Sequence, residues 1–188
     1  MKWRDLVDRS EGHIAKLAPG FKERVAKWYH ELTIKKIPVL IYCSTRTAAE
    51  QDELYKKRPK VTNARGTPVC QSFHCYGRAV DAVPCAVSPH RSYEPAWNDE
   101  VTYQLMRNCA EKYQMRWLSF ETPHFEDANF KDWRDLAASE SVGTKVAEKN
   151  RQAMQAQNTR VSDDPVGARS AAAKGSTKPL RKVSLRKP

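Results

Sequence analysis

Two short histidine-containing segments place the strongest constraint on the fold of this chain. The first runs from residue 71 to 81 and contains His74 and Asp81, and the second runs from 121 to 126 and contains His124. Two imidazoles and a carboxylate are a common ligand set for zinc, and three protein ligands leave a fourth position for water. If both segments contribute to one site, the fold must bring them together.

A glycine lies between the histidine and the aspartate of the first segment. His74 is followed by Gly77 and then by an alternating run, 78–83, which is typical of a strand ended by Pro84. Without a Cβ, Gly77 permits a turn with positive φ. Such a turn would let His74, on a loop, converge with Asp81 on the strand.

The second segment needs an irregularity if it is to form the same site. Pro123 disfavours helix at the preceding residue, so 117–125 is predicted as one or two short strands interrupted at this proline. Residues three apart on a regular strand face opposite sides of the sheet. Glu121 and His124 can therefore share a site only if the strand twists or bulges between them.

The histidines and carboxylates of the two segments each have an expected role. Either ring nitrogen of His74, an oxygen of Asp81 and a nitrogen of His124 would bind the zinc ion. Glu121 would stay outside the ligand set, take a proton from water and hand it to a leaving amine. Glu126 is expected to be structural or to support a ligand.

Arg46 is a further candidate because of its position in the chain. It follows an apolar run, 37–42, predicted as a buried strand, and it precedes Thr47 and Glu50, which have the spacing of a helix capping box. A guanidinium beside the open amides of a helix N-terminus favours an anion. Arg46 would contact either a developing oxyanion or a substrate carboxylate. The alternative is a surface arginine on a turn.

Apolar spacing predicts three amphipathic helices. They cover about 21–33, 99–113 and a last stretch that begins near residue 130. Asn98 is the expected N-cap of the second helix. The residues of that helix expected to face the core are Val101, Leu105, Met106, Cys109 and Ala110. Because helices and short strands do not alternate regularly, we predict an α+β fold with a small, mainly antiparallel sheet flanked by helices.

Charge divides the chain into two parts. The protein has a net charge of +11, and most of it lies in residues 143–188, where apolar residues are scarce. We therefore predict one compact domain over 1–142 and a disordered basic tail over 143–188. Such a tail suits contact with anionic envelope polymers. It lacks the interleaved aromatic residues of single-strand binders, so no nucleic-acid partner is expected.

The five cysteines, at positions 43, 70, 75, 85 and 109, cannot all pair with one another. Reduced thiols, packed as small apolar side chains, are expected in place of a disulfide framework. Cys70 and Cys75 flank His74 and form a weaker, rival zinc set.

The beginning of the chain indicates where the protein is made. Acidic residues stand where a secretion signal would need an apolar stretch, and no run approaches the length of a membrane span. We expect synthesis in the cytoplasm and, where the protein is exported, another route.

The two segments resemble the motifs of a known family. The matching residues read Ser72-x-His74-x-x-Gly77-x-Ala79-x-Asp81, then Glu121-x-Pro123-His124-Phe125-Glu126. They are similar to those of the zinc D-alanyl-D-alanine carboxypeptidases and L-alanyl-D-glutamate endopeptidases, which cut peptidoglycan peptides and include phage endolysins. The resemblance implies one zinc ion on His74, Asp81 and His124, Glu121 as the catalytic base, and substrate contacts from Arg46 and Ser72.

The resemblance also implies a function, with alternatives. The first expectation is a monomeric phage or prophage endolysin that cleaves the L-alanyl-D-glutamate bond of stem peptides and reaches the wall through a holin-type route. A D-alanyl-D-alanine carboxypeptidase is the second. A non-catalytic wall-binding or virion module is the alternative from another class. The loops 56–73 and 84–97 are expected to decide which bond is cut.

Overall fold

Strand β2 (Ala79–Val87) is the centre of the fold in a computed structural model of the protein, which describes residues 1–162 and the side chains of 1–145, 148–152 and 155. It pairs with β1 (Val39–Cys43), β3 (Tyr93–Pro95) and β5 (Glu121–Asp127), and β4 (Met115–Leu118) pairs with β5. Every pairing is antiparallel. The predicted α+β class with a small antiparallel sheet is confirmed.

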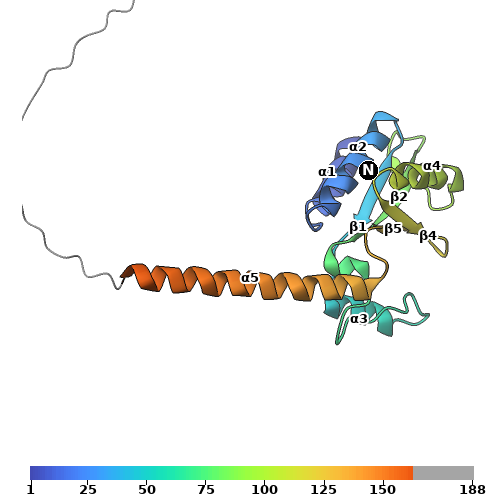
Figure 1. Ribbon diagram of the computed structural model, residues 1–188. Helices are drawn as coiled ribbons and strands as arrows, with labels where there is room; N and C mark the ends of the chain where they lie inside the picture. The colour runs from blue at the N-terminus through green and yellow to red at the C-terminus, as the bar shows by residue number, and fades with distance from the viewer. Residues whose placement is uncertain (163–188) are drawn as a thin grey trace, which may run out of the picture. The chain divides into compact units, whose positions relative to one another are not determined.

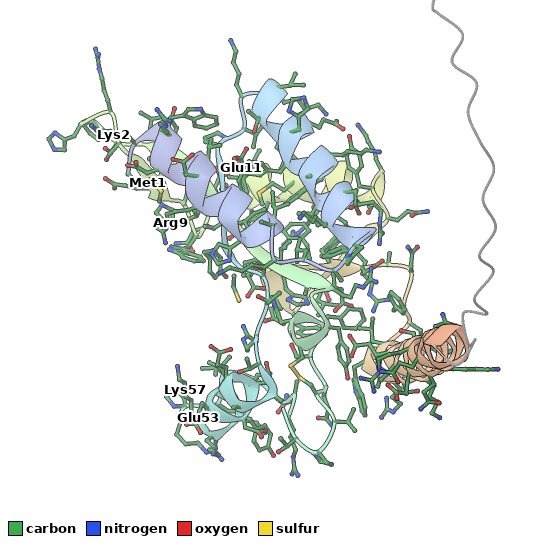
Figure 2. The ribbon with its side chains drawn as sticks, turned by 90° about the vertical axis from the view of Figure 1, so that its left-hand side faces the viewer. Met1, Lys2, Arg9, Glu11, Glu53 and Lys57 are labelled. Atoms are coloured by element: carbon green, nitrogen blue, oxygen red, sulfur yellow. A yellow bond between two sulfur atoms is a disulfide. The ribbon has the colours of Figure 1, made fainter. Side chains whose placement is uncertain are left out.

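Three helices supply most of the apolar side chains that cover the sheet. These are α1 (Trp3–Ile14), α2 (Phe21–Ile34) and α4 (Glu100–Glu111). The first two lie side by side. Helix α3 (Ala48–Lys56) stands apart from them, and Figure 2 labels Glu53 in this helix and Lys57 at its end (Figures 1 and 2). A short 3-10 helix, η1 (Phe73–Tyr76), leads into β2.

Alternation along β2 separates an apolar side of the sheet from the side that carries polar groups. Val80 and Ala82 are fully buried in the main core, against Trp28 of α2 and other apolar residues. Successive side chains point to opposite faces, so Ala79 belongs to a second, smaller cluster with Phe73. Asp81 lies on that second side.

Two details of the predicted elements differ in the structure. Strand β2 does not end at Pro84, which stays in register opposite Val39 of β1. Helix α4 is capped by Asp99, whose Oδ1 accepts a hydrogen bond from the Thr102 amide at 3.0 Å, and not by Asn98.

The buried face of α4 was also predicted wrongly in part. Val101 and Leu105 are 76% and 48% exposed, whereas Tyr103 is fully buried. Met106, Cys109 and Ala110 are buried as predicted. A tyrosine ring offers more apolar area than a valine. The helix therefore turns the stripe that contains Tyr103 toward the sheet.

The last helix extends beyond the predicted domain. Helix α5 runs from Trp133 to Ser162, so 143–162 are helical where we expected disorder. Alanine, glutamate, glutamine and lysine have high helix propensity, which a prediction based on apolar content ignores. Residues Met1–Lys145 form one compact unit, and the second unit begins at Val146. The remainder of the predicted tail, 163–188, lies outside the described residues.

Within residues 1–162, we find no helix that combines the length and the apolar character needed to cross a membrane.

Candidate metal centre

Three neighbouring strands present one residue each at the same level of the sheet. Cys43 of β1 pairs with Asp81 of β2, and Asp81 pairs with His124 of β5. Directly opposite residues of an antiparallel pair have their side chains on one face. The register between Ile41 and Cys43 shifts by one residue. This bulge allows Cys43, despite the alternation of β1, to face Asp81.

His74 reaches the same place from η1, and Gly77 makes the turn that allows it. Gly77 has a φ of 62° and ends η1, as its position in the sequence predicted. A Cβ on this glycine would lie 2.9 Å from the backbone nitrogen of Ala18, so a side chain is excluded by space as well as by conformation. The chain can therefore return from His74 into β2 within a few residues.

Asp81 Oδ1 is the point on which the two histidines converge. It lies 3.2 Å from His74 Nε2 and 3.0 Å from His124 Nδ1. The imidazole rings are 5.1 Å apart and meet edge to face. All three side chains are buried. The predicted approach of the two segments is thus present in the fold.

The second nitrogen of each histidine has its own acceptor. His74 Nδ1 donates to the carbonyl oxygen of Ser44 at 2.8 Å, and His124 Nε2 donates to Glu126 Oε2 at 3.2 Å. A carbonyl or carboxylate oxygen can only accept, so these nitrogens carry the hydrogens. In a neutral imidazole, the nitrogen that faces Asp81 then presents a lone pair. Such outer acceptors orient histidine ligands in metal sites.

Lone pairs that face an anionic oxygen need a positive charge between them. In the metal-free protein, protons fill this role. Burial alone would lower the pKa of His74, but its hydrogen bonds to Asp81 and Cys43 outweigh burial and raise the pKa to about 10. Hydrogen bonds to Asp81 and Glu126 likewise raise the pKa of His124 to about 9, against burial. Burial would raise the pKa of Asp81, yet both histidines hold it well below its usual range.

The distances identify a group that could hold a metal ion. One ligand atom from each of Cys43, His74 and Asp81 lies within 4.8 Å of the other two. Zinc bonds of about 2.0–2.3 Å place tetrahedral ligand atoms roughly 3.3–3.7 Å apart. The contacts of Asp81 with both histidines are close to that spacing. His124 Nδ1 contacts Asp81 but does not belong to the group, so the distances add Cys43 to the residues that the sequence predicted.

Sequence reasoning missed Cys43. It follows the predicted strand, 37–42, and belongs to no metal-ligand motif, so its own neighbours in the chain give no signal. Its position depends on strand pairing and on the bulge before it.

Arg46 points into the centre. Its Nη2 donates to Cys43 Sγ at 3.4 Å and lies 3.9 Å from Asp81 Oδ2, while its Nη1 donates to Gln51 Oε1 at 2.8 Å. The capping box that follows is confirmed, because Thr47 Oγ1 accepts from the Glu50 amide and Glu50 Oε2 accepts from the Thr47 amide. The alternative of a surface arginine on a turn is wrong.

Glu121 and Ser72 lie on a cavity that opens beside the centre. The cavity has a volume of about 800 Å³, and its lining includes Arg46, Ser72, His74, Glu121 and His124. The β4–β5 register shifts between Trp117 and Leu118, which supplies the irregularity that the spacing of Glu121 and His124 required.

One of the two predicted specificity loops reaches this cavity. Residues 61–64 and 71–73 of the loop 56–73 line it. Gln51 Nε2 donates to the Ala64 carbonyl at 2.9 Å and holds the loop in place. No residue of 84–97 lines the cavity. Part of that stretch pairs as β3 with β2.

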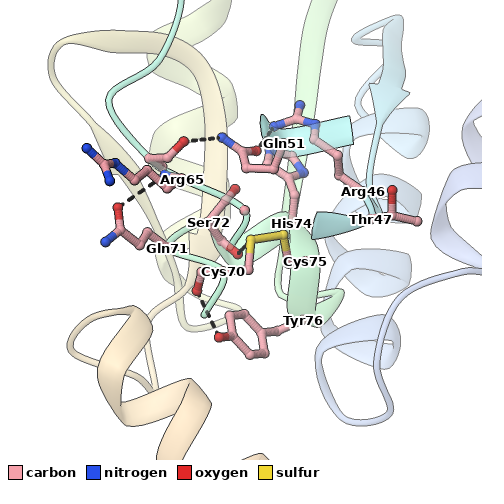
Figure 3. The surroundings of a disulfide bond; sticks show 12 residues. Arg46, Thr47, Gln51, Arg65, Cys70, Gln71, Ser72, His74, Cys75 and Tyr76 are labelled. Carbon is pink, nitrogen blue, oxygen red and sulfur yellow. Dashed lines mark hydrogen bonds between the residues drawn. A yellow bond between two sulfur atoms is a disulfide. The ribbon is translucent and has the colours of Figure 1, made fainter. Parts of the chain in front are cut away.

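Cys70 and Cys75 form a disulfide, so the prediction of reduced thiols is wrong for this pair. Cys75 lies in η1 and Cys70 lies just before it, and the turn folds the chain back and brings the two sulfurs together (Figure 3). Tyr76 Oη donates to the Cys70 carbonyl at 2.8 Å across the same turn. Because the sulfurs are bonded to each other, the rival zinc set fails. The free cysteines are Cys43, Cys85 and Cys109.

Arg116 holds the carboxylate that supports His124. Its Nε lies 2.5 Å from Glu126 Oε1, and its other nitrogens donate to the carbonyls of Phe130 and Lys131 at 2.7 and 2.9 Å. Glu126 is therefore fixed on both oxygens, as a supporting role requires.

The chain matches no protein-family model and no curated protein. The likeness to the peptidoglycan peptidases rests on the motifs, and it stays a prediction.

Proposed function

We propose that this protein is a zinc-dependent peptidase that cleaves peptidoglycan stem peptides, as a phage or prophage endolysin with L-alanyl-D-glutamate endopeptidase activity. One observation carries the proposal. Asp81 Oδ1 is faced by one nitrogen of His74 and one of His124, while the other nitrogen of each ring is bound to a protein acceptor.

The donor set fits zinc. Neutral imidazoles and a carboxylate are ligands that zinc accepts, and the two outer acceptors would keep both rings oriented. His74 Nε2, Asp81 and His124 Nδ1 would hold the ion. When bound, zinc supplies a Lewis acid that polarises a carbonyl and lowers the pKa of water toward ~7.

Glu121 is the residue suited to move the proton. It is exposed at the start of β5 and lines the same cavity as His74 and His124. Its carboxylate would take a proton from the attacking water and pass it to the leaving amine. A base of this kind must stay outside the ligand set, and Glu121 does not belong to the group of possible ligands.

Arg46 and Ser72 are suited to bind the substrate. Both line the cavity, and the Arg46 guanidinium would bind a carboxylate of the stem peptide or the oxyanion of the reaction. Phe120 and Val61 also line the cavity and are 82% and 58% exposed, so they offer apolar contact to the peptide. A volume of about 800 Å³ is in the usual range for a ligand pocket.

The test is bound metal together with product analysis. Full-length protein is purified, its metal content is measured, and purified peptidoglycan is digested with and without a chelator. We expect zinc in the protein, loss of activity on chelation, recovery when zinc is restored, and mass shifts that place the cut between L-alanine and D-glutamate.

Other products would contradict parts of the proposal. Release of terminal D-alanine from otherwise intact stems would identify a carboxypeptidase. Zinc-loaded protein that binds peptidoglycan without releasing any product would favour the wall-binding alternative.

A further inference from the structure

Cys43 lies at the proposed metal centre and has no part in the proposed reaction. Its backbone stands opposite Asp81 in the β1–β2 pair, and its Sγ lies 3.9 Å from His74 Nδ1. It belongs with His74 and Asp81 to the group whose ligand atoms are within 4.8 Å of one another. Its position calls for an explanation.

Packing alone does not explain this thiol. Cys85 and Cys109 are 7% and 3% exposed and lie in the main core, as free cysteines commonly do. Cys43 is only partly buried, and its Sγ lies beside the His74 ring, 3.9 Å from Nδ1, and accepts a hydrogen bond from the guanidinium of Arg46. Those neighbours are polar, and the sulfur also lies within 4.8 Å of possible ligand atoms of His74 and Asp81.

We propose that Cys43 is a fourth protein ligand, which closes the coordination of the metal in the resting protein. The inference rests on the metal site of the proposed function. A zinc site with four protein ligands is closed, whereas a catalytic site keeps one position open. With Cys43 bound, the position needed by water is occupied. Binding the metal releases the thiol proton to solvent.

Arg46 provides a way to open the site. Its Nη2 contacts Cys43 Sγ at 3.4 Å, and the same guanidinium lines the cavity. A substrate carboxylate that draws Arg46 away removes a contact that orients the sulfur toward His74 and Asp81. Substrate entry is thus coupled to release of Cys43. The resting protein is protected from premature activity until a stem peptide arrives.

The first test uses cobalt in place of zinc. Co²⁺ bound to a thiolate gives a sulfur-to-metal charge-transfer band that nitrogen and oxygen ligands do not give. We expect the band in the wild-type, full-length protein, its loss in Cys43→Ala, and its retention in Cys85→Ala. Wild-type protein that binds cobalt without the band overturns the proposal, as does a band that persists in Cys43→Ala.

The second test needs no variant and covers the case in which Cys43→Ala does not fold. Wild-type protein is treated with iodoacetamide, with and without zinc, and the modified cysteines are mapped by mass spectrometry. We expect zinc to suppress the alkylation of Cys43 and chelation to restore it. Equal rates in both conditions overturn the proposal.

The two proposals fail in different ways. A thiolate band and zinc protection without any cleavage of peptidoglycan would sustain the ligand role of Cys43 and refute the peptidase. Zinc-dependent cleavage without a thiolate band would sustain the peptidase and refute the ligand role of Cys43.

Discussion

Asp81 and His124 stand directly opposite each other in the β2–β5 pair, and His124 Nδ1 lies 3.0 Å from Asp81 Oδ1. This contact joins the two histidine segments at the middle of the sheet. A slip of one residue between the strands would turn one of the side chains to the opposite face. The centre therefore depends on strand register as much as on the identity of its residues.

The stability of the metal-free protein should depend on pH through the histidines. Their pKa values are raised from 6.5 to about 10 for His74 and about 9 for His124. Because the folded protein binds these protons more tightly than the unfolded chain, the histidines stabilise the fold fully below pH 6.5. This stabilisation is lost as the pH rises through 9 to 10. We expect the free energy of unfolding to fall as the pH rises from 6.5 to about 10.

Asp81 sets the acid limit of the same effect. Its pKa is lowered from 3.8, so its contribution is present above that value and lost as the pH falls below it. Urea unfolding of chelated protein, from acid pH to about pH 10, measures both the loss of stability through Asp81 at low pH and the loss through the histidines at high pH. Zinc-loaded protein is the control, because zinc binds neutral imidazoles and replaces the protons. A flat profile for the metal-free protein would contradict the assignment.

Glu121→Gln should abolish most of the activity and leave the metal in place. Glutamine keeps the shape of the side chain and cannot take a proton, so we expect a loss on the order of 10²–10⁴ in kcat. Rates on soluble muropeptides and zinc content measure the two effects. Glu111→Gln, an exposed position at the end of α4, is the matched control. A Glu121→Gln variant with normal rates would rule out the residue as the base.

Glu126→Gln should weaken metal binding. Glu126 Oε2 accepts from His124 Nε2, and a glutamine amide can present a donor there and disturb the tautomer. Loss of such an outer partner costs roughly 10–100-fold in metal affinity. Competition with a chromogenic chelator measures it. Glu148→Gln, whose glutamate also pairs with an arginine, should keep the wild-type affinity.

Removal of the Cys70–Cys75 disulfide should destabilise the protein and loosen the turn that carries His74 and Ser72. Closing so short a loop stabilises by about 2 kcal/mol in the chain-entropy account. We expect reductant to lower the melting temperature of the wild type and to have no effect on a Cys70→Ser, Cys75→Ser double variant. An identical response of the two proteins would show that the disulfide does not form in solution.

Deletion of 146–188 should separate catalysis from envelope binding. The compact unit ends at Lys145, and the deleted part carries much of the positive charge. We expect hydrolysis of soluble fragments to persist and attack on whole envelopes to weaken, with a smaller difference at high salt. If the truncated protein keeps full activity on both substrates, the tail has no role in the attack on envelopes.

Features encoded by neighbouring residues were predictable. The capping box at Thr47 and Glu50, the positive-φ turn at Gly77 and the helix that begins at Phe21 are local, and the structure contains all three. The face of α4 was harder to predict. Its apolar residues allow more than one stripe, and only packing against the sheet selects the one that contains Tyr103.

The sequence by itself determined which residues are able to bind a metal, where the chain can turn, and that the fold is α+β. Tertiary structure decided which of those residues meet. A bulge in β1 turns Cys43 toward Asp81, a register shift in β4–β5 lets Glu121 and His124 line one cavity, and a tight turn joins Cys70 to Cys75. The first two arrangements depend on which strands pair and in what register. Pairing is set by the free energy of the whole sheet and its core, and no short segment contains that information.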